Sequence, residues 1–273
     1  MRRSGVAALL AALALAGCRQ AEAPHVDPAA YDQFFLWAGV PSPRAVARAS
    51  ELYILGGEIR RGGAARLIDM RAGVPHVRRA KVWLTIRTER LDWDAATWNA
   101  VRGMLARWRT AGNRLEGLQI DFDAATPGLT RYRAFLEAVR RELPQGARLS
   151  ITGLLDWSAN GDPAELARLA GLVDEVVIQT YQGRTTIPGY AAWFGHIDTL
   201  PLRHKIALVE GGEWTPPPAL ALDRRFAGYV VFLLAPADST AFSKQLESPA
   251  DLENAVKQKP GAADAMQSGR TML

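Results

Sequence analysis

Three consecutive segments decide the fold: Val82-Trp83-Leu84-Thr85-Ile86, Ala95 to Ala111, and Leu115 to Phe122. The first and third are short runs rich in apolar and β-branched residues, which is typical of strands. The middle segment carries apolar side chains at three-to-four spacing and is followed by Gly112, which predicts an amphipathic helix that stops there. This strand–helix–strand order predicts a parallel β/α unit.

The same alternation extends along the chain in both directions. Further strands are expected at residues 34–40, 51–59, 149–154, 173–180, 205–209 and 228–234, and helices at residues 44–50, 129–143, 162–170 and 190–200. Residues 60–75 are rich in Gly and Arg, and a short helix at residues 64–70 is one interpretation of them.

Eight expected strands separated by helices predict an α/β protein with a (β/α)8 TIM barrel in a single domain, residues 31–257. Most of the strands are continuous apolar runs, as expected where helices cover a parallel sheet. A doubly wound open sheet is the alternative. The first strand–helix turn lacks a Gly-rich phosphate fingerprint, which disfavours the nucleotide-binding version of that sheet.

The composition indicates an ordinary folded chain. It has 273 residues, of which 48% are apolar and 22% charged, so long-range disorder is not expected. The formal net charge is +5, and two of those charges, Arg2 and Arg3, lie in a segment that we expect to be removed. The basic residues are not clustered and no recognition motif accompanies them, so a nucleic-acid partner is not expected.

Residues 1–17 predict a signal peptide. A short positive segment precedes the apolar residues 6–16, which are too few to span a bilayer. The segment ends Leu15-Ala16-Gly17-Cys18, which resembles the bacterial lipobox, and Cys18 is the only cysteine of the chain. The resemblance implies a lipid on Cys18, and the alternative is an ordinary secretory signal followed by an incidental cysteine.

This interpretation predicts a lipid-anchored protein of the bacterial cell envelope, periplasmic or facing the outer membrane. Residues 18–30 would form a tether to the membrane, and residues 258–273 a disordered tail. Lipid chains anchor a protein by burying methylene groups, at roughly 0.8 kcal/mol each.

Reactive side chains of such barrels occupy the carboxyl ends of the strands. This rule nominates Glu58, Arg87, Asp121, Asp123, Asp156, Trp157, Gln179, Tyr181, Gln182, Glu210 and Trp214 as candidate site residues. We expect Trp37, Trp98 and Trp108 to serve packing instead, because they lie within strand or helix patterns. Glu210 and Glu213 are candidates for a further carboxylate across the mouth.

The segment from Glu116 to Asp123 carries the sharpest signal. Side chains alternate along a strand, so Gln119, Asp121 and Asp123 share one face, which we expect to be the barrel interior. Two neighbouring carboxyl groups push one pKa upward, so that one acid keeps its proton while the other is ionised. A general acid needs such a proton near neutral pH. The alternative is that these acids cap the next helix or bind an arginine.

This segment resembles the fourth-strand signature of family 18 glycoside hydrolases, the chitinases and endo-β-N-acetylglucosaminidases, which reads Asp-Gly-x-Asp-x-Asp-x-Glu. Matched residue by residue, Glu116 takes the first Asp position, and Gly117 and Asp121 are identical. Gln119 replaces the second Asp, and Asp123 falls on the catalytic Glu.

The chain resembles this family at a second place and as a whole. Tyr181 matches the Tyr that ends strand six, where the family's Met-x-Tyr-Asp is Gln179-Thr180-Tyr181-Gln182 here. From about Phe34 to Ala235 the chain also resembles bacterial lipoproteins with a domain of unknown function related to these barrels.

The resemblance implies a glycan substrate and a retaining, substrate-assisted reaction without a cofactor or metal. Asp123 would protonate the glycosidic oxygen while the N-acetyl group of the substrate attacks the anomeric carbon. Asp121 would orient and stabilise that group, and Tyr181 would hydrogen-bond to it.

The sequence departs from the family at several of these positions. Asp123 is one methylene shorter than Glu, Gln119 and Gln182 cannot ionise, and residues 230–234 lack the Trp that floors the sugar site. The leading hypothesis is therefore an envelope-anchored, glycoside-hydrolase-like barrel that acts on or binds a glycan. A non-catalytic glycan-binding lipoprotein and an envelope assembly protein are the alternatives. An Asp-x-Asp pair also suits a divalent cation, but no further ligand accompanies it, so no metal is predicted.

Overall fold

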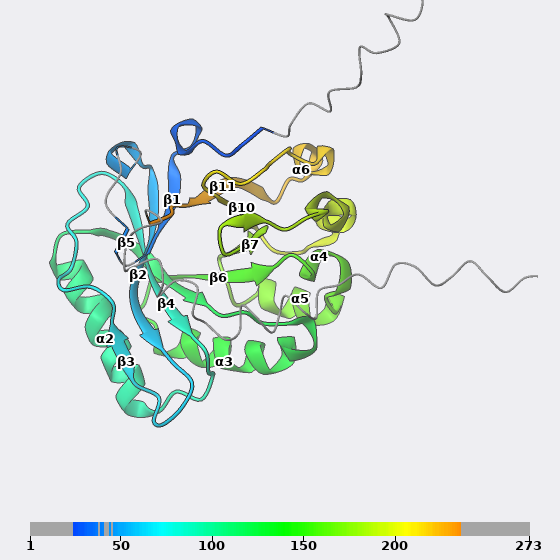
Figure 1. The fold of residues 1–273 in the computed structure, drawn as a ribbon. Coiled ribbons are helices and arrows are strands. Elements are labelled where there is room, and N and C mark those ends of the chain that lie inside the picture. Colours follow the sequence, from blue (N-terminus) through cyan, green and yellow to red (C-terminus); the bar gives the residue numbers. More distant parts are fainter. Residues whose placement is uncertain (1–23, 38, 41–43, 45, 236–273) are drawn as a thin grey trace, which may run out of the picture.

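A computed structural model describes residues 24–37, 39–40, 44 and 46–235 (Figure 1). Its eight parallel strands are β1 (Gln33–Leu36), β2 (Glu51–Ile59), β4 (Lys81–Thr88), β5 (Arg114–Asp121), β6 (Arg148–Leu154), β7 (Glu175–Gln179), β10 (His204–Val209) and β11 (Phe226–Phe232). Strand β1 pairs with β2 on one side and with β11 on the other, which closes the ring. The predicted (β/α)8 barrel is thus confirmed, and an open doubly wound sheet is excluded.

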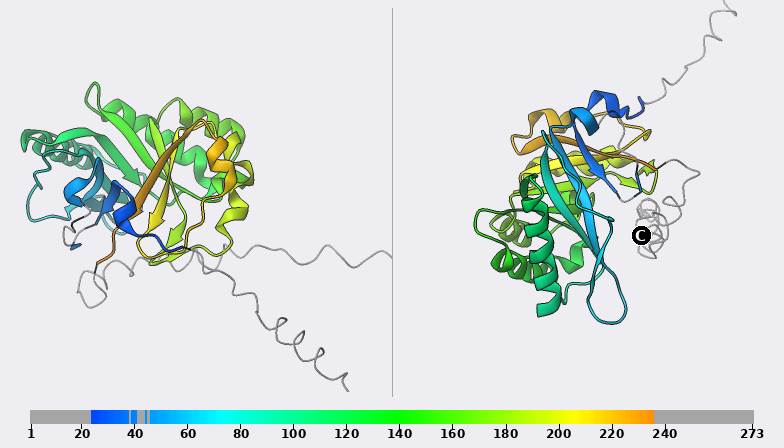
Figure 2. Two further views of the ribbon diagram at one scale, coloured as in Figure 1. Left: turned by 90° about the horizontal axis from the view of Figure 1, so that it is seen from above. Right: turned by 90° about the vertical axis from the view of Figure 1, so that its left-hand side faces the viewer.

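Helices cover the outside of the ring (Figure 2). They are α2 (Ala95–Thr110), α3 (Leu129–Glu142), α4 (Trp157–Asn160), α5 (Pro163–Ala170) and α6 (Pro218–Leu222), together with the 3₁₀ segments η1 (Pro28–Ala30), η2 (Val46–Arg48), η3 (Thr126–Gly128) and η4 (Tyr190–Thr199). Asp94 begins α2 by accepting the N–H of Thr97, and Asp162 caps α5 in the same way. The apolar faces of α2 and α3 are buried against the strands, as their periodicity predicts.

Four local expectations differ from the structure, one in the type of element and three in helix type or length. Residues 64–70 do not form a helix, because β3 (Leu67–Asp69) turns back and pairs antiparallel with the end of β2. Residues 190–200 form a 3₁₀ segment rather than an α-helix, with a non-helical backbone at His196. The strand expected at residues 34–40 is β1, which ends at Leu36, and the helix expected at residues 44–50 is reduced to η2.

The part of the predicted tether that the structure describes lies against the barrel. Val26 is buried and exchanges backbone hydrogen bonds of 2.9 Å with Gly211 and Gly212, in the loop after β10. Residues 1–17, Cys18 and residues 258–273 lie outside the described part of the chain. Within the described part, no helix is both long and apolar enough to cross a bilayer.

The barrel interior holds a buried ion cluster near the amino ends of the strands. Lys205 Nζ lies 2.7 Å from Glu51 Oε2 and 3.4 Å from Glu175 Oε2, and it donates to the Tyr53 hydroxyl at 2.7 Å. The Tyr53 hydroxyl donates to Glu175 Oε1, and Trp83 Nε1 donates to Glu51 Oε1, both at 2.5 Å. Burial raises the pKa of Glu51, but the Lys205 ammonium outweighs burial and holds that pKa below its ordinary value.

Hydrogen bonds extend this cluster toward the carboxyl ends of the strands. Ser150 Oγ donates to Glu175 Oε1 at 3.1 Å and accepts from Gln119 Nε2 at 3.2 Å, and Thr85 Oγ1 donates to Gln119 Oε1 at 3.0 Å. Gln119 therefore faces the interior as expected, but it lies fully buried below the mouth. Polar side chains therefore line the interior face of strands β4 to β7, from Glu175 near the amino ends to Asp121 at the carboxyl end of β5.

Replacing Lys205 with methionine is expected to destabilise the barrel strongly. The variant leaves the buried carboxylates Glu51 and Glu175 without their cation, a change that costs about 3–5 kcal/mol in comparable buried pairs. Urea unfolding of wild type and Lys205→Met measures this loss.

A surface lysine provides the matched control. The side chain of Lys81 is 45% exposed, against 3% for Lys205, and it pairs with Glu116 at 3.7 Å. Lys81→Met should cost less than about 1 kcal/mol, because solvent already screens this pair. Equal losses in the two variants would contradict the assigned role of Lys205.

Candidate functional site

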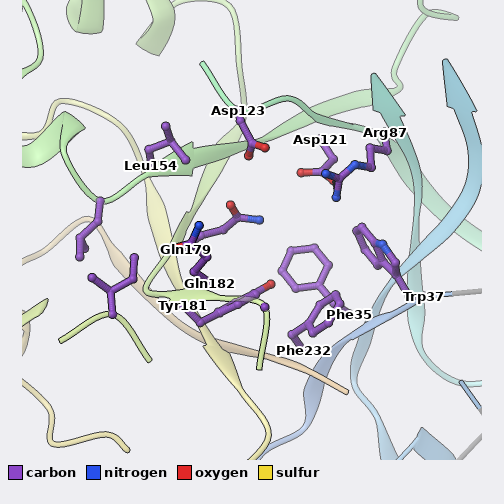
Figure 3. A pocket seen from close by; sticks show the side chains of 13 residues that line it. Phe35, Trp37, Arg87, Asp121, Asp123, Leu154, Gln179, Tyr181, Gln182 and Phe232 are labelled. Carbon is purple, nitrogen blue, oxygen red and sulfur yellow. Dashed lines mark ion pairs between the residues drawn. The ribbon is translucent and has the colours of Figure 1, made fainter. Parts of the chain in front are cut away.

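A hollow opens at the carboxyl ends of the barrel strands (Figure 3). It is lined by Phe35, Trp37, Arg87, Asp121, Asp123, Leu154, Leu155, Gln179, Tyr181, Gln182, Gly183, Ile187 and Phe232. Residues of β1, β4, β5, β6, β7 and β11 thus meet in one place, together with the β8–β9 hairpin, whose strands are β8 (Tyr181–Gln182) and β9 (Thr185–Thr186). Six of the nominated site residues lie in this lining.

Asp121 is the last residue of β5 and is buried at the base of the hollow. Thr152 Oγ1 donates a hydrogen bond of 3.0 Å to its Oδ1, and Arg87 Nη1 lies 3.8 Å from its Oδ2. The parallel register places Arg87 directly beside Asp121 on the neighbouring strand. Arg87 and Thr152 together stabilise the ionised carboxylate, so the expected alternative of an arginine partner holds for Asp121 while the residue still faces the hollow.

Asp123 lies two residues beyond the strand, with its carboxylate turned into the hollow (Figure 3). Phe122 between the two acids points outward, where its ring lies 5.2 Å from that of Tyr132 on α3. Among the described residues no side chain hydrogen-bonds or forms an ion pair with the Asp123 carboxylate. Asp123 does not cap the next helix either, because neither η3 nor α3 has a side-chain cap. Its oxygens are therefore accessible to a ligand.

Tyr181 lies across the hollow from the two acids. Burial raises the pKa of its hydroxyl well above 10, and the nearby charges of Asp121 and Asp123 raise it further. The phenol therefore keeps its proton and can donate a hydrogen bond. Gln179 and Gln182 add two amide groups to the same wall (Figure 3).

An aromatic wall made by Phe35, Trp37 and Phe232 faces the polar groups (Figure 3). The Trp37 ring lies 5.2 Å from Phe232 and 5.8 Å from Phe35, and the Tyr181 ring lies 5.3 Å from Phe232. Trp37 is buried in the core, as its assignment to packing predicts, and it also borders the hollow. The strand-end rule applied to β1 would have found it, since Trp37 directly follows Leu36. The other apolar residues of the lining could not be identified as site residues from the sequence, because apolar side chains carry no chemical group that marks a site.

Several nominated residues are not brought into the lining. Glu58 pairs with Arg60 at 2.8 Å, and Glu210 Oε2 accepts the N–H of Leu234 at 2.9 Å. Glu213 is exposed in the loop after β10. Gln119 lies below the hollow, in the interior network.

The remaining nominated residues support the loops around the hollow. Burial raises the pKa of Asp156, and Thr126 in η3 offsets part of that rise. Trp157 is buried, and its Nε1 donates to the carbonyl of Ala124 at 2.8 Å, just after Asp123. Trp214 is also buried. Among the described residues, no group of three or more His, Cys, Asp or Glu side chains is arranged to hold a metal ion.

Because burial and the nearby carboxylates raise its pKa, the Tyr181 hydroxyl is expected to stay protonated at pH 10, where an ordinary tyrosine titrates. Near-ultraviolet absorbance of tyrosinate in wild type and Tyr181→Phe measures this, and the two folded proteins should give the same signal up to that pH. In urea the wild type should show one additional tyrosine that titrates near pH 10. A folded-state difference already present near pH 10 would contradict the assignment.

Residues 75–189, which contain both acids and Tyr181, match the model of a family described as "Domain of unknown function (DUF3142)". None of the curated proteins matches this chain.

Three solved structures illustrate the likeness. The spore cortex-lytic enzyme SleL of Bacillus cereus is 17% identical with a TM-score of 0.41, and the match covers 65% of this chain and 50% of that chain. The chitinase domain of the spore coat protein CotE of Clostridium difficile is 13% identical with a TM-score of 0.44, and the match covers 74% of this chain and 70% of that chain. The xylanase and alpha-amylase inhibitor protein XAIP-II of Scadoxus multiflorus is 12% identical with a TM-score of 0.47, and the match covers 79% of this chain and 98% of that chain. This chain spans half the length of the SleL structure.

Proposed function

We propose that the hollow binds a sugar unit of a glycan and that the protein acts there as a glycoside hydrolase. A pyranose ring has an apolar face and a rim of hydroxyl groups. The wall of Trp37, Phe35 and Phe232 suits that face, and the carboxylates and amides on the opposite side suit the hydroxyls.

The observation that carries this proposal is the unequal state of two neighbouring carboxyl groups. Asp121 is fixed by Thr152 and Arg87, whereas Asp123 is turned into the hollow without a described partner. Hydrolysis of a glycosidic bond needs one group that gives a proton and one that stays ionised. Asp123 and Asp121 suit these two roles.

On a substrate with an N-acetyl group, the roles follow the reaction that the family resemblance implies. Asp123 gives its proton to the glycosidic oxygen, and the acetamido oxygen attacks the anomeric carbon as the glycosidic bond breaks. The charge of Asp121 stabilises the positive charge that develops on the acetamido group, and the Tyr181 hydroxyl donates to that group. Water then opens the cyclic intermediate and returns a proton to Asp123.

Two observations favour a second function, glycan binding without cleavage. Arg87 offsets part of the charge that Asp121 would contribute, and the carboxyl of Asp123 is set back by one methylene from the position of a Glu. Errors of about 1 Å in catalytic geometry cost large factors in rate. An assembly role is not favoured, because the exposed large apolar side chains of the described residues are Ile68 and Leu222, on different elements.

Replacing either acid separates the two functions. If the protein is a hydrolase, Asp123→Asn should slow the release of reducing ends from N-acetylglucosamine oligosaccharides by about 10²–10⁴-fold, the usual contribution of a general acid. Asp121→Asn should also slow release strongly, while Asp69→Asn, an exposed acid on β3, should leave it unchanged. Wild type that binds oligosaccharides without releasing reducing ends would assign the binding function instead.

We propose further that Cys18 carries a lipid and holds the protein at the bacterial envelope. The support is the sequence Leu15-Ala16-Gly17-Cys18 after an apolar segment of signal-peptide length. Cys18→Ser should abolish labelling by a fatty-acid analogue and move the protein from the membrane fraction to the soluble fraction. Labelling that persists in Cys18→Ser would refute this proposal without touching the glycan site.

A further inference from the structure

The chain segment that precedes η1 and β1 is hydrogen-bonded to the loop after β10. Residues 24–26 run antiparallel to residues 211–214, and we call these two segments the N-terminal clamp. Val26 N–H donates to the carbonyl of Gly212, and Gly211 N–H donates to the carbonyl of Val26, both at 2.9 Å. In a third backbone hydrogen bond, the N–H of Trp214 donates to the carbonyl of Pro24 at 3.0 Å. Val26 is buried. The position of residue 24 is therefore fixed relative to the barrel.

The N-terminal clamp lies on the same rim as the hollow. Residues 211–214 follow the carboxyl end of β10, and the clamp begins where the arrowhead of β10 ends (Figure 2, left). The backbone of Gly212 lies so near Thr186 that a Cβ at residue 212 would be 2.6 Å from its hydroxyl. Thr186 belongs to the hairpin that supplies Tyr181 and Gln182 to the hollow.

The chain between Cys18 and the clamp is short. Six residue steps separate Cys18 from Pro24, and an extended chain covers about 3.3–3.6 Å per step, so the span is at most about 20 Å. Helix α2, with 16 residues, is alone about 24 Å long. A lipid on Cys18 would therefore hold the N-terminal clamp, and the part of the rim beside it, close to the bilayer.

A second feature of the rim suits a lipid surface. The hairpin between β2 and β3 extends past the carboxyl end of β2, and its Arg60, Arg61 and Arg66 are exposed. In the ring, strands β11 and β1 separate β10, which precedes the clamp, from β2, which precedes the hairpin. The clamp and the hairpin therefore lie on two different sides of the hollow. Basic side chains near an anionic bilayer favour binding to it.

We propose that the hollow faces the bilayer to which the protein is anchored and takes a saccharide that is carried on a lipid of that membrane. This inference rests on the proposed glycan site and the proposed lipid on Cys18. A lipid-borne saccharide reaches the rim directly by diffusing in the bilayer. A glycan far from the membrane would have to enter the narrow space beneath the barrel.

Fluorescence quenching tests the orientation without any need for activity. A fluorophore is attached to Ala64→Cys, at the tip of the β2–β3 hairpin, or to Arg224→Cys, which precedes β11 at the opposite end; both residues are exposed. The lipidated proteins are placed in vesicles of phosphatidylethanolamine and phosphatidylglycerol that contain a lipid-borne quencher. We expect at least a several-fold stronger quenching at residue 64 than at residue 224. Equal quenching, or stronger quenching at residue 224, would overturn the inference.

The tether itself provides the matched control. A flexible Gly/Ser insertion of about twenty residues between Gln20 and Ala21 would allow a reach several times longer, and the difference between residues 64 and 224 should then shrink. A difference that survives the insertion unchanged would show that the tether does not set the orientation.

The substrate class is tested with one oligosaccharide in two forms. An N-acetylglucosamine oligosaccharide is presented free in solution or coupled to a phospholipid in the vesicles, and its cleavage or binding is measured. The short natural tether should favour the lipid-coupled form at least several-fold, and the inserted tether should reduce that preference while leaving the free form unaffected. Equal use of both forms overturns this inference and leaves the proposed glycan site standing. Failure with both forms refutes the glycan site itself.

Discussion

The pairing of β1 with both β2 and β11 is the constraint on which the rest of the structure depends. In a closed ring of parallel strands all carboxyl ends meet at one rim. Side chains as distant in sequence as Phe35 and Phe232 thereby come into contact, with ring centroids 6.4 Å apart. In an open sheet β1 and β11 would not lie across the interior from β5, which carries Asp121, and the aromatic wall would not face the acids.

The charges inside this ring are arranged at two levels with different consequences. At the lower level Lys205 lies between two glutamates, and hydrogen bonds satisfy the remaining polar atoms of the cluster. Buried charges are tolerated when they are paired in this way. At the upper level Asp121 follows the same rule, but Asp123 beyond it has no described partner. The lower level therefore serves the barrel, whereas the upper level leaves a carboxylate for a ligand.

The strand-end rule could identify the rim but not the direction of each side chain. Alternation along β5 placed Asp121 and Asp123 correctly, because an apolar residue that must face the helices separates them. Glu210 satisfies the same rule, yet its carboxylate accepts a backbone N–H from Leu234, a tertiary contact that no periodicity encodes. The burial of Trp37 was predicted, but its place at the hollow was not, because an apolar run predicts packing whether its last residue is covered or borders a hollow. Local patterns fix the elements, while the neighbours fix the orientations.

Arg87 determines how the charge of Asp121 can be used. The guanidinium lies 3.8 Å from the carboxylate and favours its ionised form, which the proposed stabilising role requires. It would also offset some of the field that this carboxylate exerts on a positive charge developing on a bound sugar. The position of a substrate decides which effect is larger. A group bound on the Tyr181 side would approach the acids from across the hollow, opposite the strand that carries Arg87 (Figure 3). Catalysis is then compatible with the ion pair when the reacting group occupies the Tyr181 side, whereas a sugar held beside Arg87 would be bound without being cleaved.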